Sequence, residues 1–174
     1  MKKSFRYSVI MISIVISGLA IVSCEKPNVF EPNVFEDEDL IDSLFQKAQD
    51  TLAYNGSKYI LETYLYRDFM PGGPISEERP LISILYLVNS DSLIVSENLK
   101  IDKLYVIKEK LVYKDTPEFL VDNSIPEYKQ SYICRKGPEW ETEINVDVVI
   151  MVVEKNTNEN FFLIARNQPI EKVW

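Results

Sequence analysis

The chain has 174 residues, of which 27 are acidic and 19 are basic, so its formal net charge is −8 at pH 7. Nucleic acid and anionic lipid headgroups require clustered Lys and Arg, and this acidic balance argues against both as partners. The sequence contains no histidine, which excludes Ser-His-Asp triads, Cys-His dyads and histidine-ligated zinc or copper. It also contains no Walker-type loop and no C-x-x-C pair, so we expect no cofactor.

Residues 1–23 have the pattern of an export signal. Basic residues at positions 2, 3 and 6 precede a long uncharged, mostly apolar run, which closes with Ile21-Val22-Ser23-Cys24. This motif resembles the lipobox of bacterial lipoproteins, with Ile21 where Leu is commonest. The resemblance implies cleavage before Cys24, a diacylglyceryl thioether on its sulfur and an acyl chain such as palmitate on the new N-terminus. The membrane is then a partner, and the expected location is the outer membrane, facing the periplasm or the outside.

The alternative to a lipid anchor is a signal anchor whose cysteine is incidental. The uncharged run of about 18 residues is at the lower limit of what spans a bilayer. Membrane attachment is expected under either interpretation, with Cys24 as the site of lipid attachment under the first.

Residues 24–39 are expected to form an acidic tether that contains proline. The pentapeptide PNVFE occurs twice in succession, at 27–31 and 32–36, and acidic residues continue to Asp39. This composition favours an extended, solvated spacer. A competing interpretation is that Val29-Phe30 and Val34-Phe35 are two copies of a docking motif, since a spacer has little need of Phe. A third is that the acidic residues direct the protein to the cell surface.

Residues 40–174 are expected to form a single domain that begins with one short helix. Apolar residues recur at helical spacing from Leu40 to Ala48, and Asp39 is placed to cap the helix. From Thr51 onward the apolar period changes to two, which predicts strands. Asn55-Gly56 lies between two such runs and predicts a tight hairpin, because both turn positions require positive φ.

The remaining strands are predicted at 59–68, 81–88, 101–108, 111–114, 128–136, 145–154 and 161–166, with proline-containing loops at 70–80 and 115–127. The candidates are joined mostly by short turns and no helix separates them. This pattern predicts an all-β fold, an antiparallel β-sandwich of about 7–8 strands with a short N-terminal helix.

The predicted strand number and spacing resemble those of immunoglobulin-like and fibronectin-III-like sandwiches. The resemblance implies two packed sheets, but no Cys pair bridges them here, and Trp140 follows a turn. The stretch from Tyr59 to Pro71 is also similar to segments of uncharacterised small bacterial lipoproteins, which implies no activity.

Carboxylate chemistry is the enzymatic alternative that the composition leaves open. Paired Asp and Glu side chains can act as acid and base in glycoside hydrolysis. The candidates are Glu62, Asp68 and Asp147, of which Asp147 is the only charge on an apolar strand face and needs a partner such as Arg67 or Arg166. The interpretation that we favour is a surface or salt-bridged carboxylate.

Other candidate sites are explained by ordinary strand and turn chemistry. Strand alternation places Cys134 on the same side as Tyr128 and Tyr132, which predicts a buried, inert thiol rather than a redox group. The oxygen-rich stretches 36–39, 89–92 and 121–124 offer ligands for calcium without EF-hand spacing, so we expect no metal.

The favoured function is a lipid-anchored, non-enzymatic binding or accessory module of the cell envelope with a protein or glycan partner. Tyr64 and Tyr66 lie on one strand face beside Glu62 and form a candidate binding surface, although cross-strand packing also explains them. The alternatives are a carboxylate-dependent glycan hydrolase and an inhibitor or scaffold of a partner protein.

Overall fold

A computed structural model describes residues 33–71 and 78–174 of the chain. The described residues form one ten-stranded sheet and one short helix, rather than the seven or eight strands expected. The elements are β1 (Val34–Glu36), α1 (Glu38–Lys47), β2 (Leu52–Tyr54), β3 (Ser57–Asp68), β4 (Leu81–Asn89), β5 (Leu99–Lys108), β6 (Leu111–Asp115), β7 (Glu118–Leu120), β8 (Lys129–Cys134), β9 (Asn145–Glu154) and β10 (Asn160–Val173).

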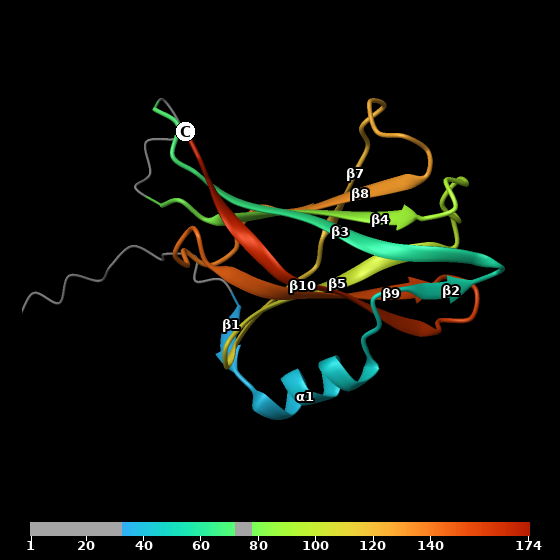
Figure 1. The fold of residues 1–174 in the computed structure, drawn as a ribbon, viewed down its shortest axis with the longest axis horizontal. Helices are drawn as coiled ribbons and strands as arrows, with labels where there is room; N and C mark the ends of the chain where they lie inside the picture. The colour runs from blue at the N-terminus through green and yellow to red at the C-terminus, as the bar shows by residue number, and fades with distance from the viewer. Residues whose placement is uncertain (1–32, 72–77) are drawn as a thin grey trace, which may run out of the picture.

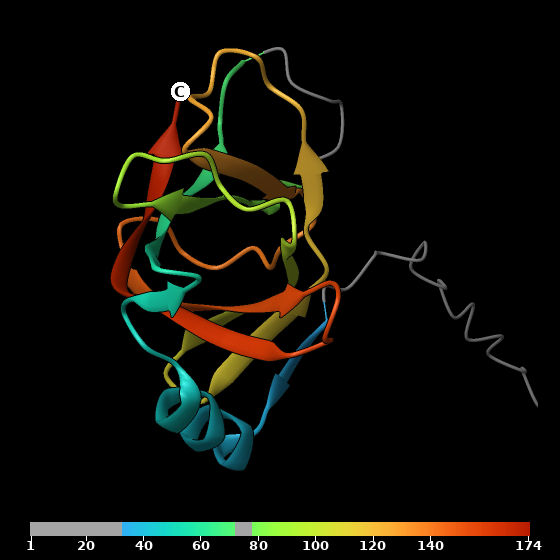
Figure 2. The same ribbon diagram turned by 90° about the vertical axis from the view of Figure 1, so that its right-hand side faces the viewer.

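The strands follow the order β1-β6-β5-β9-β10-β3-β4-β8-β7, and β2 pairs with β3 outside this path. The sheet curls so that the layer of β3, β4 and β8 lies over the layer of β5, β9 and β10 (Figure 1). The view from the side shows the same two layers, with α1 outside the β5/β9/β10 layer (Figure 2). The fold is therefore all-β as predicted, but it is a curled open sheet, and two separate sheets of a sandwich are not seen.

Strand β10 joins the two layers into one sheet, because it pairs with a strand of each layer. Its first half pairs antiparallel with β9, whereas Ile170–Val173 pair in parallel with Leu65–Asp68 of β3. The register shifts between Ala165 and Gln168, where Asn167 adopts a positive φ of 56°. The prediction of a purely antiparallel fold is wrong at this pair of strands. The predicted strand at 161–166 also ended too early, because the bulge lets it continue to Val173.

The predicted hairpin at Asn55-Gly56 is confirmed. Asn55 and Gly56 have φ values of 49° and 80°, and β2 and β3 pair antiparallel on either side of them. The predicted turn between β5 and β6 is also present, with Glu109 at a φ of 55°. The segment 115–127 differs from the predicted loop, because it contains the short edge strand β7.

Helix α1 begins earlier than the sequence predicted, because Asp37 and not Asp39 is its N-cap. The Asp37 carboxylate accepts a hydrogen bond from the Leu40 N–H at 2.8 Å. This leaves Glu38 and Asp39 in the first turn, where negative charge is favourable to the helix dipole. Ile41 and Leu44 are buried on the sheet.

The second copy of the pentapeptide is part of the folded body. Val34–Glu36 form β1, which pairs antiparallel with β6 at one end of the sheet. The structure therefore differs from the expected extended spacer over residues 34–39. The predicted signal, Cys24 and the first pentapeptide copy lie outside the described residues.

Two apolar clusters hold the sheet. The larger lies between the two layers and includes Leu85, Tyr132, Val148 and Trp140. The smaller lies between α1 and the outer side of the β5/β9/β10 layer and includes Leu44, Val149 and Ile164. Strand β9 contributes to both, as its apolar residues on both faces predicted.

Candidate functional site

Two of the three carboxylates proposed for catalysis, Glu62 and Asp68, lie too far apart to form a catalytic pair. Glu62 and Asp68 lie six residues apart on β3, a separation of roughly 20 Å along a strand. A glycosidase pair needs about 5 to 10 Å between its carboxyl groups. Glu62 is also engaged by Lys129, whose Nζ lies 2.5 Å from its carboxylate.

Asp147 has the structural role that the sequence favoured. Its carboxylate lies 4.0 Å from the Arg166 guanidinium and accepts a hydrogen bond from the Asn167 N–H at 2.8 Å. Arg166 is therefore its partner, and the alternative partner Arg67 is wrong. The carboxylate of Asp147 holds the bulge of β10 against β9.

The loops considered for calcium are organised by their own hydrogen bonds. The Asp122 carboxylate accepts hydrogen bonds from the Ser124 hydroxyl and N–H, which lower its pKa. The Asn89 side chain accepts a hydrogen bond from the Asp91 N–H in the same way. Across residues 33–71 and 78–174, no three Cys, Asp or Glu side chains gather closely enough to hold a metal ion.

Cys134 is a buried free thiol on β8, as predicted. It belongs to the core between the layers, together with Tyr132. Burial, and to a smaller extent the nearby Asp115 carboxylate, raise the pKa of the thiol far above its usual value. A thiol that stays protonated in the core is a poor nucleophile.

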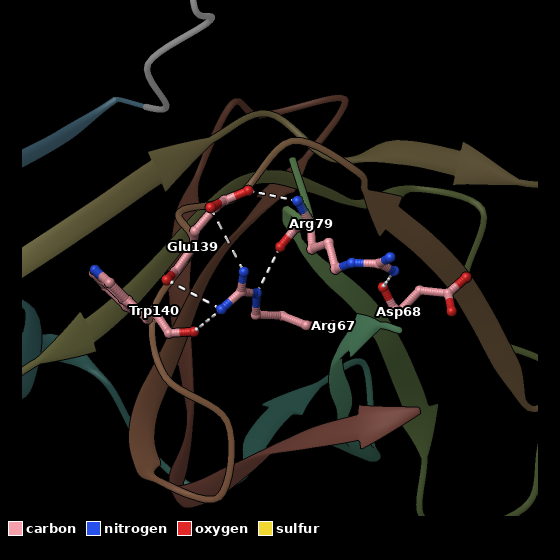
Figure 3. A network of polar contacts seen from close by, with 5 residues as sticks. All are labelled: Arg67, Asp68, Arg79, Glu139 and Trp140. Atoms are coloured by element: carbon pink, nitrogen blue, oxygen red, sulfur yellow. Dashed lines mark hydrogen bonds and ion pairs between the residues drawn. The ribbon is translucent and has the colours of Figure 1, made fainter. Parts of the chain in front are cut away.

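A polar network at the end of β3 was not predicted from the sequence (Figure 3). The Arg67 guanidinium donates hydrogen bonds to three backbone carbonyl oxygens: Arg79 at 2.5 Å, Glu139 at 3.2 Å and Trp140 at 2.8 Å. It also lies 3.7 Å from the Glu139 carboxylate, which in turn accepts a hydrogen bond from the Arg79 N–H. The Arg79 guanidinium donates to the Asp68 carbonyl oxygen at 2.7 Å. This network joins the end of β3 to the start of β4 and to the segment before β9.

Cationic side chains surround the ring of Phe69 next to this network. Arg67, Arg79 and Lys172 lie 5.4, 5.2 and 4.7 Å from its centroid. The ammonium of Lys172 also lies 3.9 Å from the centroid of Trp174, which is exposed. Lys172 and Trp174 lie about 100 residues further along the chain than Arg67 and Phe69, so no local signal in the sequence could have brought the two groups together.

A shallow cleft of about 320 Å³ lies at the open side of the curled sheet. Apolar residues from β5, β7 and β8 form its floor, and the Phe119 ring packs on the edge of the Tyr132 ring, with centroids 5.3 Å apart. Lys155 at the rim donates to the Glu97 carbonyl oxygen, so this ammonium is already engaged. The cleft contains none of the carboxylates proposed for catalysis: it is lined by Glu97, Leu99, Lys100, Phe119, Gln130, Tyr132 and Lys155.

Five large, mostly apolar side chains lie next to one another on the outer side of the β3/β4 layer. The strand register places Tyr64 beside Ile84, and Tyr66 beside Ile82. Tyr86 follows on β4 opposite Glu62. These five residues, Tyr64, Tyr66, Ile82, Ile84 and Tyr86, are all partly exposed and are called here the β3–β4 outer face.

The two tyrosines of this face are stacked on each other. Their ring centroids are 5.0 Å apart with an interplanar angle of 27°. Partial burial, and then the Glu171 carboxylate, raise the pKa of Tyr64. Lys129 and its partner Glu62 lie at one margin of the face, with the ammonium 5.6 Å from the centroid of Tyr86. Both alternatives that the sequence left open are therefore compatible with the geometry: the tyrosines pack together and also present exposed ring surface.

None of the helices within the described ranges, which leave out 1–32 and 72–77, is long and apolar enough to cross a membrane. No protein-family model, curated protein or solved structure matches the chain.

Proposed function

We propose that the protein is a non-enzymatic binding module that is held at the cell envelope by lipid on Cys24 and that contacts a partner protein through the β3–β4 outer face. The observation that supports this proposal is that only one of the two outer sides of the sheet is covered by a helix. Helix α1 covers one of them, whereas none of the described elements covers the other (Figure 1).

The chemistry of the uncovered side fits a protein partner. Tyrosine and isoleucine provide large contact areas, and Tyr adds a hydroxyl that can remain hydrogen-bonded at an interface. The charged margin of Glu62, Lys129 and Glu171 would form the polar rim of such an interface. A glycan is the less favoured partner, since the carboxylate of Glu62 beside the rings is already engaged by Lys129.

A carboxylate-dependent hydrolase is the less favoured alternative. Its candidates Glu62 and Asp147 are paired with Lys129 and Arg166, and Asp68 lies too far along β3 from Glu62. A role as an inhibitor or scaffold of a partner protein remains within the proposal, because it uses the same surface.

Site-specific photocrosslinking of the full-length chain in its native membrane tests the binding surface. A photoreactive residue at Tyr64 should give one discrete protein adduct, while the same residue at the exposed Leu93 should not. Substitution of Tyr66 by Thr should weaken the adduct at position 64. Equal adducts at both positions, or none at Tyr64, would contradict the proposal.

The anchor is tested separately by labelling with a fatty-acid analogue. The wild-type chain should incorporate label, and Cys24→Ala should not. Equal incorporation by the two chains would remove the lipid anchor without affecting the proposed binding surface.

A further inference from the structure

Strand β1 shows how one copy of the pentapeptide repeat packs in the fold. Its second copy, residues 32–36, pairs with β6 through the partners Val34–Tyr113, Phe35–Val112 and Glu36–Leu111. The Lys114 N–H also donates to the Asn33 carbonyl oxygen at 3.0 Å. The docked unit is therefore Asn-Val-Phe-Glu, which is four of the five repeated residues.

Each apolar residue of this unit has its own environment. Val34 packs against the core between the layers, whereas Phe35 packs against the cluster beneath α1. Alternate residues of a strand face opposite sides, so the Val-Phe pair engages both sides of the sheet at once. The edge of β6 thus binds this short segment by strand addition, with one apolar contact on each face of the sheet.

We propose that the first copy, residues 27–31, is a second occupant of the β6 edge, in a register shifted by five residues. It has the same residues in the same order, so Val29 and Phe30 can make every contact that Val34 and Phe35 make. In the shifted register, residues 32–37 connect the docked strand to α1, whereas Asp37 alone makes this connection in the observed register. Closing a longer loop costs entropy that grows slowly with length, so the observed register dominates while the shifted one stays accessible.

The shift changes the reach of the chain before β1. Five residue steps separate Cys24 from Val29, and ten separate it from Val34. At about 3.5 Å per extended residue, the maximum reach falls from roughly 35 Å to roughly 18 Å. If Cys24 carries the proposed lipid, the register determines how far the domain stands from the membrane. The exchange itself does not depend on that lipid.

A double-mutant cycle in the full-length chain tests the exchange. One variant changes the second copy (Val34→Ser with Phe35→Ser), one changes the first (Val29→Ser with Phe30→Ser), and one changes both. Urea unfolding followed by tryptophan fluorescence gives the unfolding equilibrium constant of each. We expect the first-copy variant to match wild type. When Val34 and Phe35 are already Ser, changing Val29 and Phe30 to Ser should raise the unfolding equilibrium constant by a factor at least about ten times larger than the same change does in wild type.

The outcomes of the cycle are decisive in both directions. A combined variant that unfolds while the second-copy variant folds supports the exchange. Additive effects, or a second-copy variant that fails to fold although the first copy is intact, would overturn it.

A disulfide trap provides a second measurement. Leu111 lies opposite Glu36 in the observed register and would lie opposite Glu31 in the shifted one. Opposite residues of an antiparallel pair are close enough for a disulfide. In a Cys24→Ser, Val34→Ser, Phe35→Ser background, the Glu31→Cys and Leu111→Cys pair should crosslink. Adding Val29→Ser and Phe30→Ser should slow this crosslinking about tenfold or more, since docking requires both apolar contacts. An unchanged rate would mean that the tether reaches Leu111 without docking, and the proposal would fail.

Discussion

The two outer sides of the curled sheet are stabilised in different ways. On the β5/β9/β10 side, α1 and Phe35 bury an apolar cluster that includes Leu44 and Val149. On the β3/β4/β8 side, apolar residues remain partly exposed, and the Arg67 network fixes the end of the layer through backbone carbonyls. The first side is therefore stabilised by apolar burial. The second is stabilised by the hydrogen bonds of Arg67, called here the polar lock, and part of its surface remains exposed. The following substitutions, in order of decreasing effect, test this contrast.

Truncation of the covered side should have the largest effect. Leu44→Ala should lower the free energy of unfolding by about 3 kcal/mol, because it leaves a cavity between α1 and β9. Urea denaturation measures this change. Leu40→Ala is the matched control at a half-buried helix position and should cost less than half as much. Equal effects of the two would mean that α1 does not cover the sheet tightly.

Loss of the polar lock should be next in size. Arg67→Lys should lower the free energy of unfolding by about 2 kcal/mol, because an ammonium cannot reach the three carbonyl groups that the guanidinium binds.

The matched control for the lock is Arg166→Lys. Arg166 forms an exposed ion pair with Asp147 at 4.0 Å, so the change should lie within about 0.5 kcal/mol. Thermal unfolding of both variants measures the difference. If the Arg67 variant is as stable as the Arg166 variant, the network has no role in holding the layer.

Removal of the helix cap should have a smaller effect on the covered side. Asp37→Ala should cost about 1 kcal/mol, since the Leu40 N–H loses its acceptor at the start of α1. Asp42→Ala, an exposed position within α1, is the control and should be nearly neutral. Hydrogen exchange of the first helical turn should speed up only in the Asp37 variant. An identical response of both variants would argue against Asp37 as the cap.

Substitution on the open side should have the smallest effect. Tyr64→Thr should change the free energy of unfolding by about 0.5 kcal/mol, because only a partly exposed stacking contact with Tyr66 is lost. A loss as large as that of Leu44→Ala would show that the face is required for folding, which would weaken its proposed role in binding.

The sequence predicted most of the strands because alternation and turn residues are local signals. Asn55-Gly56 determined a hairpin through positive φ, and β9 showed apolar residues on both faces. The burial of Cys134 also followed from alternation along a single strand, whereas the choice of Arg166 over Arg67 as the partner of Asp147 came only from the structure. The short strands β1 and β7 were missed because three residues beside proline carry too little pattern.

The candidate site was less accessible from the sequence. Tyr64 and Tyr66 were identified as a surface pair on β3, but Ile82, Ile84 and Tyr86 complete the face only through the β3–β4 register. The Arg67 network joins residues about 70 positions apart, and backbone carbonyls are its main acceptors. Every residue offers a carbonyl oxygen, so residue identity does not indicate which ones Arg67 will bind.

The sequence by itself determined an acidic, histidine-free chain with an amphipathic helix and mostly alternating strands, because composition and periodicity are properties of neighbouring residues. Only the tertiary structure decided that β10 joins both layers, that β1 docks on β6 and that one outer side stays uncovered. These features depend on which strand edges and faces meet across long separations, and burial of apolar surface there is settled only when the whole sheet closes on itself.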